Sequence, residues 1–158
     1  MADKPIPTLY EWAGNNLEIF ERLIETFYDK TLEDPLLEPF FRDMPKEHRY
    51  NVALWFAEIF GGPTLYSSEH GGHAHMVKAH MHLPIEEKHR QRWMQLMNEA
   101  ADEVKLPDDP EFRSAFVAYI EWGTRMGYVF AKPGAKPPAD DSPMPIWGWG
   151  VVKPYIPE

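Results

Sequence analysis

Hydrophobic residues recur three and four positions apart in four long segments of the 158-residue chain. This spacing places them on one face of an α-helix, and no alternating pattern typical of a β-strand has useful length. The sequence therefore predicts an all-α fold. The four apolar faces comprise Leu17, Phe20, Ile24, Phe27 and Tyr28; Val52, Trp55, Phe56, Ile59 and Phe60; Trp93, Leu96, Met97, Ala100 and Val104; and Phe112, Phe116, Tyr119, Ile120 and Gly123.

Signals for the ends of helices accompany these segments. Asn15 or Asn16 can cap the first helix, because asparagine side chains accept hydrogen bonds from free backbone N–H groups. The sequence Gly-Gly-Pro at residues 61–63 ends the second helix. Asp108 or Asp109 can cap the last one, ahead of a proline that suits an early helical position.

Two regions lack helical periodicity. Residues 64–75 are predicted to form a loop, followed by a short helical turn over residues 76–81. Residues 133–158 hold seven of the sixteen prolines, so the chain is divided into a domain at 1–132 and a Pro-rich C-terminal extension at 133–158. Trp147 and Trp149 in this extension are expected to pack on the helical core or at a dimer contact, because exposed tryptophans cost stability.

Composition narrows the classes of function. Apolar residues make up 44% of the chain, enough for one domain with a hydrophobic core. The net charge of −9 argues against nucleic acid or an anionic membrane as partner. The chain has no cysteine, which excludes thiolate catalysis, iron–sulfur clusters and cysteine-bound zinc. Any metal must be held by histidine, carboxylate, methionine or tyrosine.

The expected location is the cytoplasm. No apolar run approaches the about 18 residues that a membrane span needs. The N-terminal residues also lack the cationic and apolar regions of a secretory signal.

Four of the seven histidines lie between His75 and Trp93. A histidine cluster outside a helix is often a solvated surface, and the residues alone leave open which of these side chains, if any, is a ligand. Four helices, a long irregular stretch and a histidine ahead of the third helix favour a cofactor held between helices.

At this point the chain resembles the truncated, or two-over-two, haemoglobins, most closely those of group II. The resemblance covers residues 10–130. Tyr28 precedes Gly61 by 33 residues and His80 precedes Trp93 by 13, and both spacings match the family pattern. The other matching stretches read DPLLEPFF, FGGPTLY and, in the extension, PMPIWGWG.

The resemblance implies a two-over-two helical sandwich around haem b, with His80 as the axial ligand of the iron. His82 is the nearest rival but breaks the spacing to Trp93. Histidines 70, 73 and 75 are expected to face solvent, where a separate surface zinc site is an alternative.

By the same resemblance, Tyr28 and Trp93 donate hydrogen bonds to a ligand, although each would also suit plain core packing. His48 and Val52 are implied on the ligand side, four residues apart on one helical face. A histidine at the first of these positions is unusual for group II, and it would contact the ligand, bind iron or turn to solvent. Phe41 is implied to pack on the haem plane.

Two departures from the family pattern concern the other side of the pocket. The stretch HGGHAH is one residue longer than usual. Ala79 stands where family members often carry an arginine that pairs with a haem propionate, so Lys78, Arg49 or Tyr66 is expected to take that role.

The implied function is binding of O2, NO and CO at a five-coordinate iron, with slow O2 release and redox chemistry of the NO dioxygenase or peroxidase type. An external reductase would supply the electrons, and the protein would be a monomer or homodimer. The alternatives are a non-catalytic module that binds or senses O2, NO or sulfide, and a haem-free helical protein with a histidine-rich metal site.

Overall fold

The computed structural model describes residues 4–157, and every regular element in this range is a helix, which confirms the all-α prediction. Residues 1–3 of the predicted domain and residue 158 of the predicted extension lie outside the described range. The helices are α1 (Leu9–Trp12), α2 (Glu18–Glu33), α3 (Glu38–Phe41), α4 (Lys46–Ile59), α5 (Leu65–His70), α6 (Gly72–His80), α7 (Glu87–Glu103) and α8 (Pro110–Ala131).

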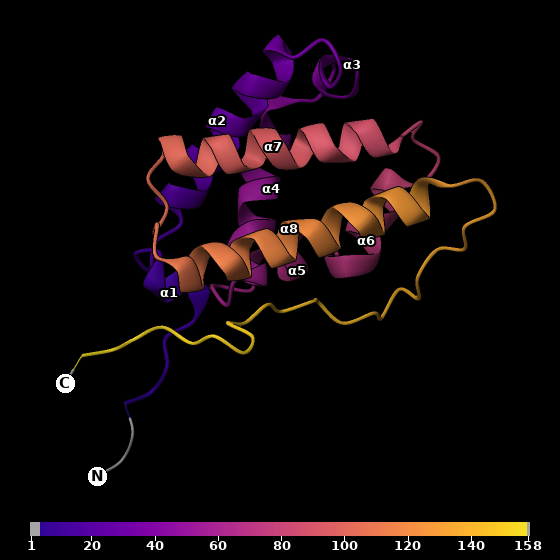
Figure 1. The fold of residues 1–158 in the computed structure, drawn as a ribbon. Coiled ribbons are helices and arrows are strands. Elements are labelled where there is room, and N and C mark those ends of the chain that lie inside the picture. The colour runs from indigo at the N-terminus through magenta and orange to yellow at the C-terminus, as the bar shows by residue number, and fades with distance from the viewer. Residues whose placement is uncertain (1–3, 158) are drawn as a thin grey trace.

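The four long helices form two layers of two. Helices α7 and α8 pack side by side, and α2 and α4 pack on each other behind them (Figure 1). Contacts between α2 and α7 join the layers, while the short α5 and α6 pack against α4 and α8 respectively. Within the described residues, no helix is long and apolar enough to cross a membrane.

Helix starts follow the predicted signals closely. The Asn16 side chain accepts from the Ile19 N–H at 3.3 Å, although the cap position itself falls to Leu17. Asp109 caps α8 by accepting from the Phe112 N–H at 2.9 Å, and its other oxygen accepts from the Trp12 indole, also at 2.9 Å. The Asp109 carboxylate thus caps the start of α8 and also forms a hydrogen bond with the last residue of α1.

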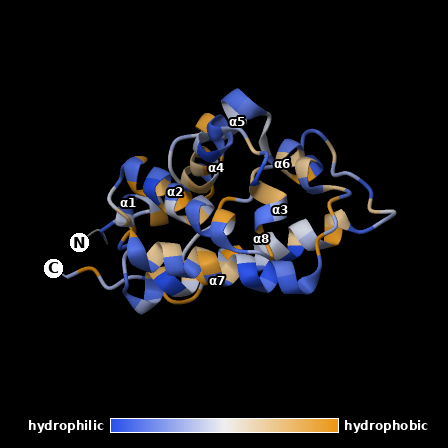
Figure 2. Cartoon of the chain, turned by 90° about the horizontal axis from the view of Figure 1, so that it is seen from above, coloured by the Kyte–Doolittle hydropathy of each residue, from blue (hydrophilic) through white to orange (hydrophobic). Residues whose placement is uncertain are grey.

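The prediction of a loop over residues 64–75 is wrong. Helices α5 and α6 occupy this stretch, joined at Gly71, whose φ of 91° is left-handed and suits glycine. The turn predicted over residues 76–81 is the C-terminal half of α6. Helix α5 is mostly hydrophilic (Figure 2) and buries only Tyr66, so its six residues carry no apolar periodicity that a sequence pattern could reveal.

The glycine pair after α4 allows the N-terminal segment to approach closely. Gly61 has a φ of 90°, and a Cβ there would lie 2.7 Å from that of Thr8. A Cβ on Gly62 would lie 2.7 Å from the Tyr10 ring and 2.7 Å from the Ala57 carbonyl oxygen. The pair therefore ends α4 and also admits α1, whose Tyr10 stacks on Phe20 in the core.

The C-terminal extension packs on the helical core, which is one of the two arrangements predicted for Trp147 and Trp149. It runs back along α8 toward the N-terminus (Figure 1). The Trp147 N–H donates to the Ile59 carbonyl at 2.7 Å, and its ring contacts those of Tyr119 and Trp122. The Trp149 indole donates to the Pro7 carbonyl at 2.7 Å.

Deletion of residues 141–158 should lower the melting temperature by several degrees, because it removes two packed tryptophans and their hydrogen bonds. Tyr155→Ala, at a side chain that is 80% exposed, is the matched control and should change nothing. Calorimetry together with gel filtration tests this prediction. An unchanged melting curve at unchanged oligomer size would show that the extension contributes nothing to stability.

Candidate functional site

A cavity of about 280 Å³ lies between the two helical layers, and aromatic and aliphatic side chains dominate its lining. Helices α2, α3, α4, α5, α6, α7 and α8 all contribute. Seven of the nine residues proposed from the sequence line it: Tyr28, Phe41, His48, Val52, Tyr66, His80 and Trp93.

His80 is the last residue of α6, and its ring is held by its own helix. The Nδ1 atom lies 2.8 Å from the Met76 carbonyl oxygen, one helical turn earlier. A carbonyl can only accept, so Nδ1 carries a proton, and in the neutral imidazole Nε2 has the lone pair. Gly127 of α8 backs the ring, since a Cβ there would come within 4.0 Å of it. The rival His82 is exposed and does not line the cavity.

Tyr28 projects from α2 and is only 3% exposed. Its hydroxyl donates to the Met44 sulfur at 3.7 Å, a weak acceptor. Burial raises the pKa of Tyr28 well above its ordinary value, although the Arg49 charge, 5.2 Å from the ring centre, acts in the opposite direction. The hydroxyl therefore remains protonated and available as a donor.

His48 lies near the start of α4, with its ring 6.1 Å from that of Tyr28. Burial lowers its pKa, and the charge of His80 adds to this effect. The imidazole is therefore neutral near pH 7. It can donate or accept one hydrogen bond without bringing a charge into the cavity.

Trp93 of α7 serves the core and the cavity together. Its ring lies 4.9 Å from Phe27, and the half-buried side chain also lines the cavity. Phe41, at the end of α3, packs edge-on against Tyr28 with ring centres 5.2 Å apart. Trp93 thus packs on the core, as one of its two interpretations from the sequence has it, and it also borders the cavity.

Of the three residues proposed as propionate partners, two lie outside the cavity lining and one is part of it. Lys78 is paired with Asp140 in the extension, and Arg49 is paired with Glu25 at 2.5 Å and Asp29 at 3.1 Å. Neither lines the cavity. Tyr66 does line it and is 6% exposed. Burial, with a contribution from the charge of Glu58, raises the pKa of Tyr66 to about 12.

Six of the seven histidines line the cavity, whereas the sequence placed only His48 and His80 there. His73 is 9% exposed, so the expectation that it faces solvent is wrong. Its ring stacks on Trp55 and Trp122, and its Nδ1 has no hydrogen-bond partner among the described residues. The directions of the side chains in α5 and in the first half of α6 could not be predicted, because a loop was expected over residues 64–75. The six are His48, His70, His73, His75, His80 and His89.

No cluster of three or more histidine, aspartate or glutamate side chains in residues 4–157 is placed to hold a metal ion. The alternative of a zinc site among the histidines near residue 73 therefore gains no support from the geometry.

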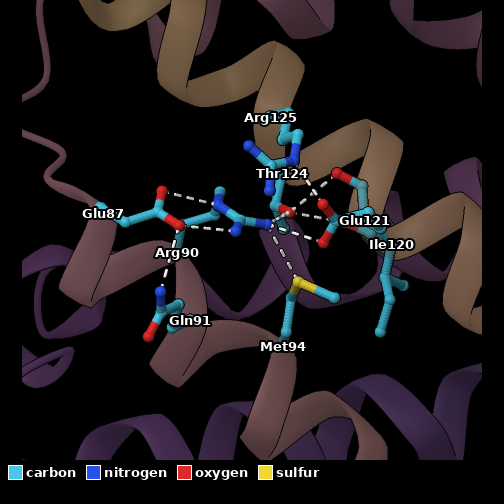
Figure 3. A network of polar contacts seen from close by, with 8 residues as sticks. All are labelled: Glu87, Arg90, Gln91, Met94, Ile120, Glu121, Thr124 and Arg125. Carbon is cyan, nitrogen blue, oxygen red and sulfur yellow. Dashed lines mark hydrogen bonds and ion pairs between the residues drawn. The ribbon is translucent and has the colours of Figure 1, made fainter.

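A second feature missed by sequence reasoning is a buried arginine beside the cavity (Figure 3). The Arg90 side chain is 5% exposed and pairs with Glu87 at 2.6 Å and with Glu121 at 2.9 Å. Hydrogen bonds from Arg90 and Gln91 lower the pKa of Glu87 to about 2. The network joins α7 to α8, and every nitrogen of the guanidinium already has a partner.

These residues fit a haem group. His80 would hold the iron through Nε2, because its Nδ1 is already bonded to the Met76 carbonyl. The lining of the cavity suits a flat apolar ring, and Tyr28, His48 and Trp93 line it with polar groups.

The sequence matches a known protein family and a curated relative. The model of the family described as bacterial-like globin matches residues 8–121. The chain is 33% identical over 116 residues to the protein named group 2 truncated hemoglobin YjbI of Bacillus subtilis, an alignment that covers 73% of this chain and 84% of that protein.

Solved structures show that the similarity to these proteins includes the fold. The crystal structure of the group II truncated hemoglobin from Bacillus anthracis superposes with a TM-score of 0.71 at 26% identity, covering 78% of this chain and 92% of that one. The structure described as truncated oxygen-avid haemoglobin from Bacillus subtilis gives a TM-score of 0.66 at 28% identity, with 75% and 97% coverage. The chain therefore belongs to the bacterial-like globin family and has the truncated globin fold of the group II haemoglobins, which implies a haem cofactor and binding of small gaseous ligands.

Proposed function

We propose that the chain binds haem b through His80 and takes up O2, NO and CO on the opposite side of the ring. The observation that supports this most directly is the hydrogen bond from His80 to the Met76 carbonyl, which leaves Nε2 free to face the cavity. When bound, haem supplies an iron that ligates small diatomic molecules and exchanges electrons.

The residues on the ligand side would set the affinity. Tyr28 holds its proton and can turn its hydroxyl from the weak sulfur acceptor of Met44 to a polarised ligand. Trp93 can add an indole N–H, and both side chains are fixed by packing on the core. Hydrogen bonds in a poorly hydrated cavity stabilise such a ligand by about 1–3 kcal/mol each. We therefore infer slow O2 release, in line with the description of the Bacillus subtilis structure as oxygen-avid.

Slow O2 release suits redox chemistry on the bound ligand better than it suits O2 delivery. We infer activity of the NO dioxygenase or peroxidase type, with electrons from an external reductase. Turnover of NO or peroxide by the purified protein with a chemical reductant tests this. Stable ligand binding without turnover would instead assign the chain to the non-catalytic gas-binding or gas-sensing modules.

His80→Ala should lose most of the haem, or the five-coordinate ferrous spectrum, because it removes the axial nitrogen. His82→Ala is the matched control and should retain both, since that side chain is exposed and outside the cavity lining. Absorption spectra of the ferric, ferrous and CO forms distinguish the two. Exchanged phenotypes would move the ligand to His82 and shift the register of the pocket by two residues.

Tyr28→Phe should speed O2 release by about ten- to a hundredfold, which corresponds to about 1.4–2.7 kcal/mol lost with the hydroxyl. The aromatic contacts with Phe27 and Phe41 remain in this variant, so the effect reports the hydrogen bond alone. Stopped-flow measurement of O2 dissociation tests it. A release rate equal to that of the natural protein would exclude Tyr28 as the main donor.

His48→Ala should change ligand association more than release. The side chain is half-buried near the start of α4, and we expect it to swing between the cavity and solvent. CO and O2 association rates measured by flash photolysis test this role as a gate. A large effect of His48→Ala on release, with none from Tyr28→Phe, would reverse the two roles.

A further inference from the structure

Redox chemistry in a cavity between helices needs a path by which electrons reach it from outside. We propose that Trp122 and Trp147 carry single electrons between the cavity and the outer surface, so that an electron donor acts at Trp147 without entering the cavity. This inference rests on the proposed function, because the electrons are exchanged with the same cofactor.

Trp122 forms the inner end of this path. It belongs to α8, and its side chain is part of the cavity wall. Its ring stacks on that of His73, with ring centres 6.5 Å apart. On the same helix, a Cβ on Gly127 would come within 4.0 Å of the His80 ring. Trp122 thus reaches the cavity from the helix that packs beside the proposed axial ligand.

Trp147 forms the outer end. Its ring centre lies 5.7 Å from that of Trp122, which is within the range of direct contact between aromatic rings. Trp147 is half-buried and is not among the residues that line the cavity. It lines instead a separate hollow between α8 and the extension, together with Val151, which is 98% exposed. A single ring contact therefore joins the cavity wall to the outer surface.

The C-terminal extension supplies this outer ring, beyond the residues 8–121 that match the globin family. The extension runs back along α8 (Figure 1), and the hydrogen bond from the Trp147 N–H to the Ile59 carbonyl holds its backbone on the core. Tryptophan and tyrosine lose an electron far more readily than phenylalanine does. The extension therefore adds an oxidisable ring at a fixed place outside the cavity wall.

Tyr119 also connects the cavity with Trp147, at 5.6 Å between ring centres, but its chemistry is less suitable. A phenol gives up an electron readily only when its proton leaves at the same time. The Tyr119 hydroxyl is buried and accepts from the Trp55 indole at 2.6 Å, and burial raises the pKa of Tyr119 well above its ordinary value. Since an indole can lose an electron and keep its proton, we assign the inner step to Trp122.

The electrons balance when hydrogen peroxide is the oxidant. Its reduction to two water molecules breaks the O–O bond and takes up two electrons and two protons, with haem as the group that exchanges electrons. Trp122 passes each electron inward and recovers one from Trp147. Trp147 then releases its indole proton to solvent, and it regains a proton from solvent with an electron from an external one-electron donor. Two donor molecules are oxidised for each peroxide.

The test treats the haem-loaded full chain with peroxide and a nitroso spin trap, and peptide mass spectrometry locates the trapped radicals. Trp147→Phe keeps a ring against Trp122 but is far harder to oxidise. Trp149→Phe is the matched control in the same extension, because its ring contacts Trp12 and Phe112, neither of which lines the cavity. A second measurement is the oxidation of ferrous cytochrome c, a donor too large to enter a cavity of about 280 Å³.

We expect the spin trap on Trp147 in the natural protein and in Trp149→Phe, and equal rates of cytochrome c oxidation by the two. Trp147→Phe should oxidise cytochrome c about tenfold more slowly. Its Soret band should respond to peroxide at the unaltered rate, because only the exchange with the surface is lost.

Trapped radicals on other residues, with none on Trp147, would overturn the inference, and this map of the natural protein depends on no variant. An unchanged rate of cytochrome c oxidation in Trp147→Phe would overturn it as well. A haem-loaded protein whose Soret band does not respond to peroxide would overturn the inference and leave gas binding standing. A chain that binds no haem would refute the proposed function together with the inference.

Discussion

The 2.8 Å contact between His80 Nδ1 and the Met76 carbonyl is the interaction on which the pocket depends. It fixes the tautomer of the imidazole and its orientation in one step, and it needs no residue outside α6. Because α6 packs on α8, with Gly127 beside the ring, the nitrogen proposed as ligand is held by a packed helix and not by a loop. The proposal of His80 as axial ligand rests on this arrangement.

The rest of the fold supports the cavity from both sides. In the aromatic core between α2, α4 and α8, the Phe60 ring lies 6.0 Å from that of Phe20 and 5.9 Å from that of Phe116. The glycine pair after α4 lets α1 close one end of this core, and the C-terminal extension covers α8 through Trp147. Aromatic and aliphatic side chains dominate the cavity lining, which strengthens a hydrogen bond that Tyr28 makes there.

The sequence predicted the long helices well because their apolar faces repeat over several turns. It also predicted the capping Asp109 and seven residues that line the cavity. It failed for α5 and for the first half of α6, which are short and meet at a glycine, and so the direction of His73 was missed. Ion pairs between residues distant in the chain could not be predicted either. The pairing of Lys78 with Asp140 depends on where the extension crosses α6, and that of Arg90 with Glu121 depends on the packing of α7 on α8.

The iron–histidine stretching band in the resonance Raman spectrum of the ferrous protein tests the central claim most directly, because it reports the axial nitrogen itself. The band should be present in the natural protein, absent from His80→Gly, and restored to that variant by added imidazole, which fills the space left by the side chain. Persistence of an unchanged band in His80→Gly without imidazole would contradict the account, since another residue would then supply the ligand.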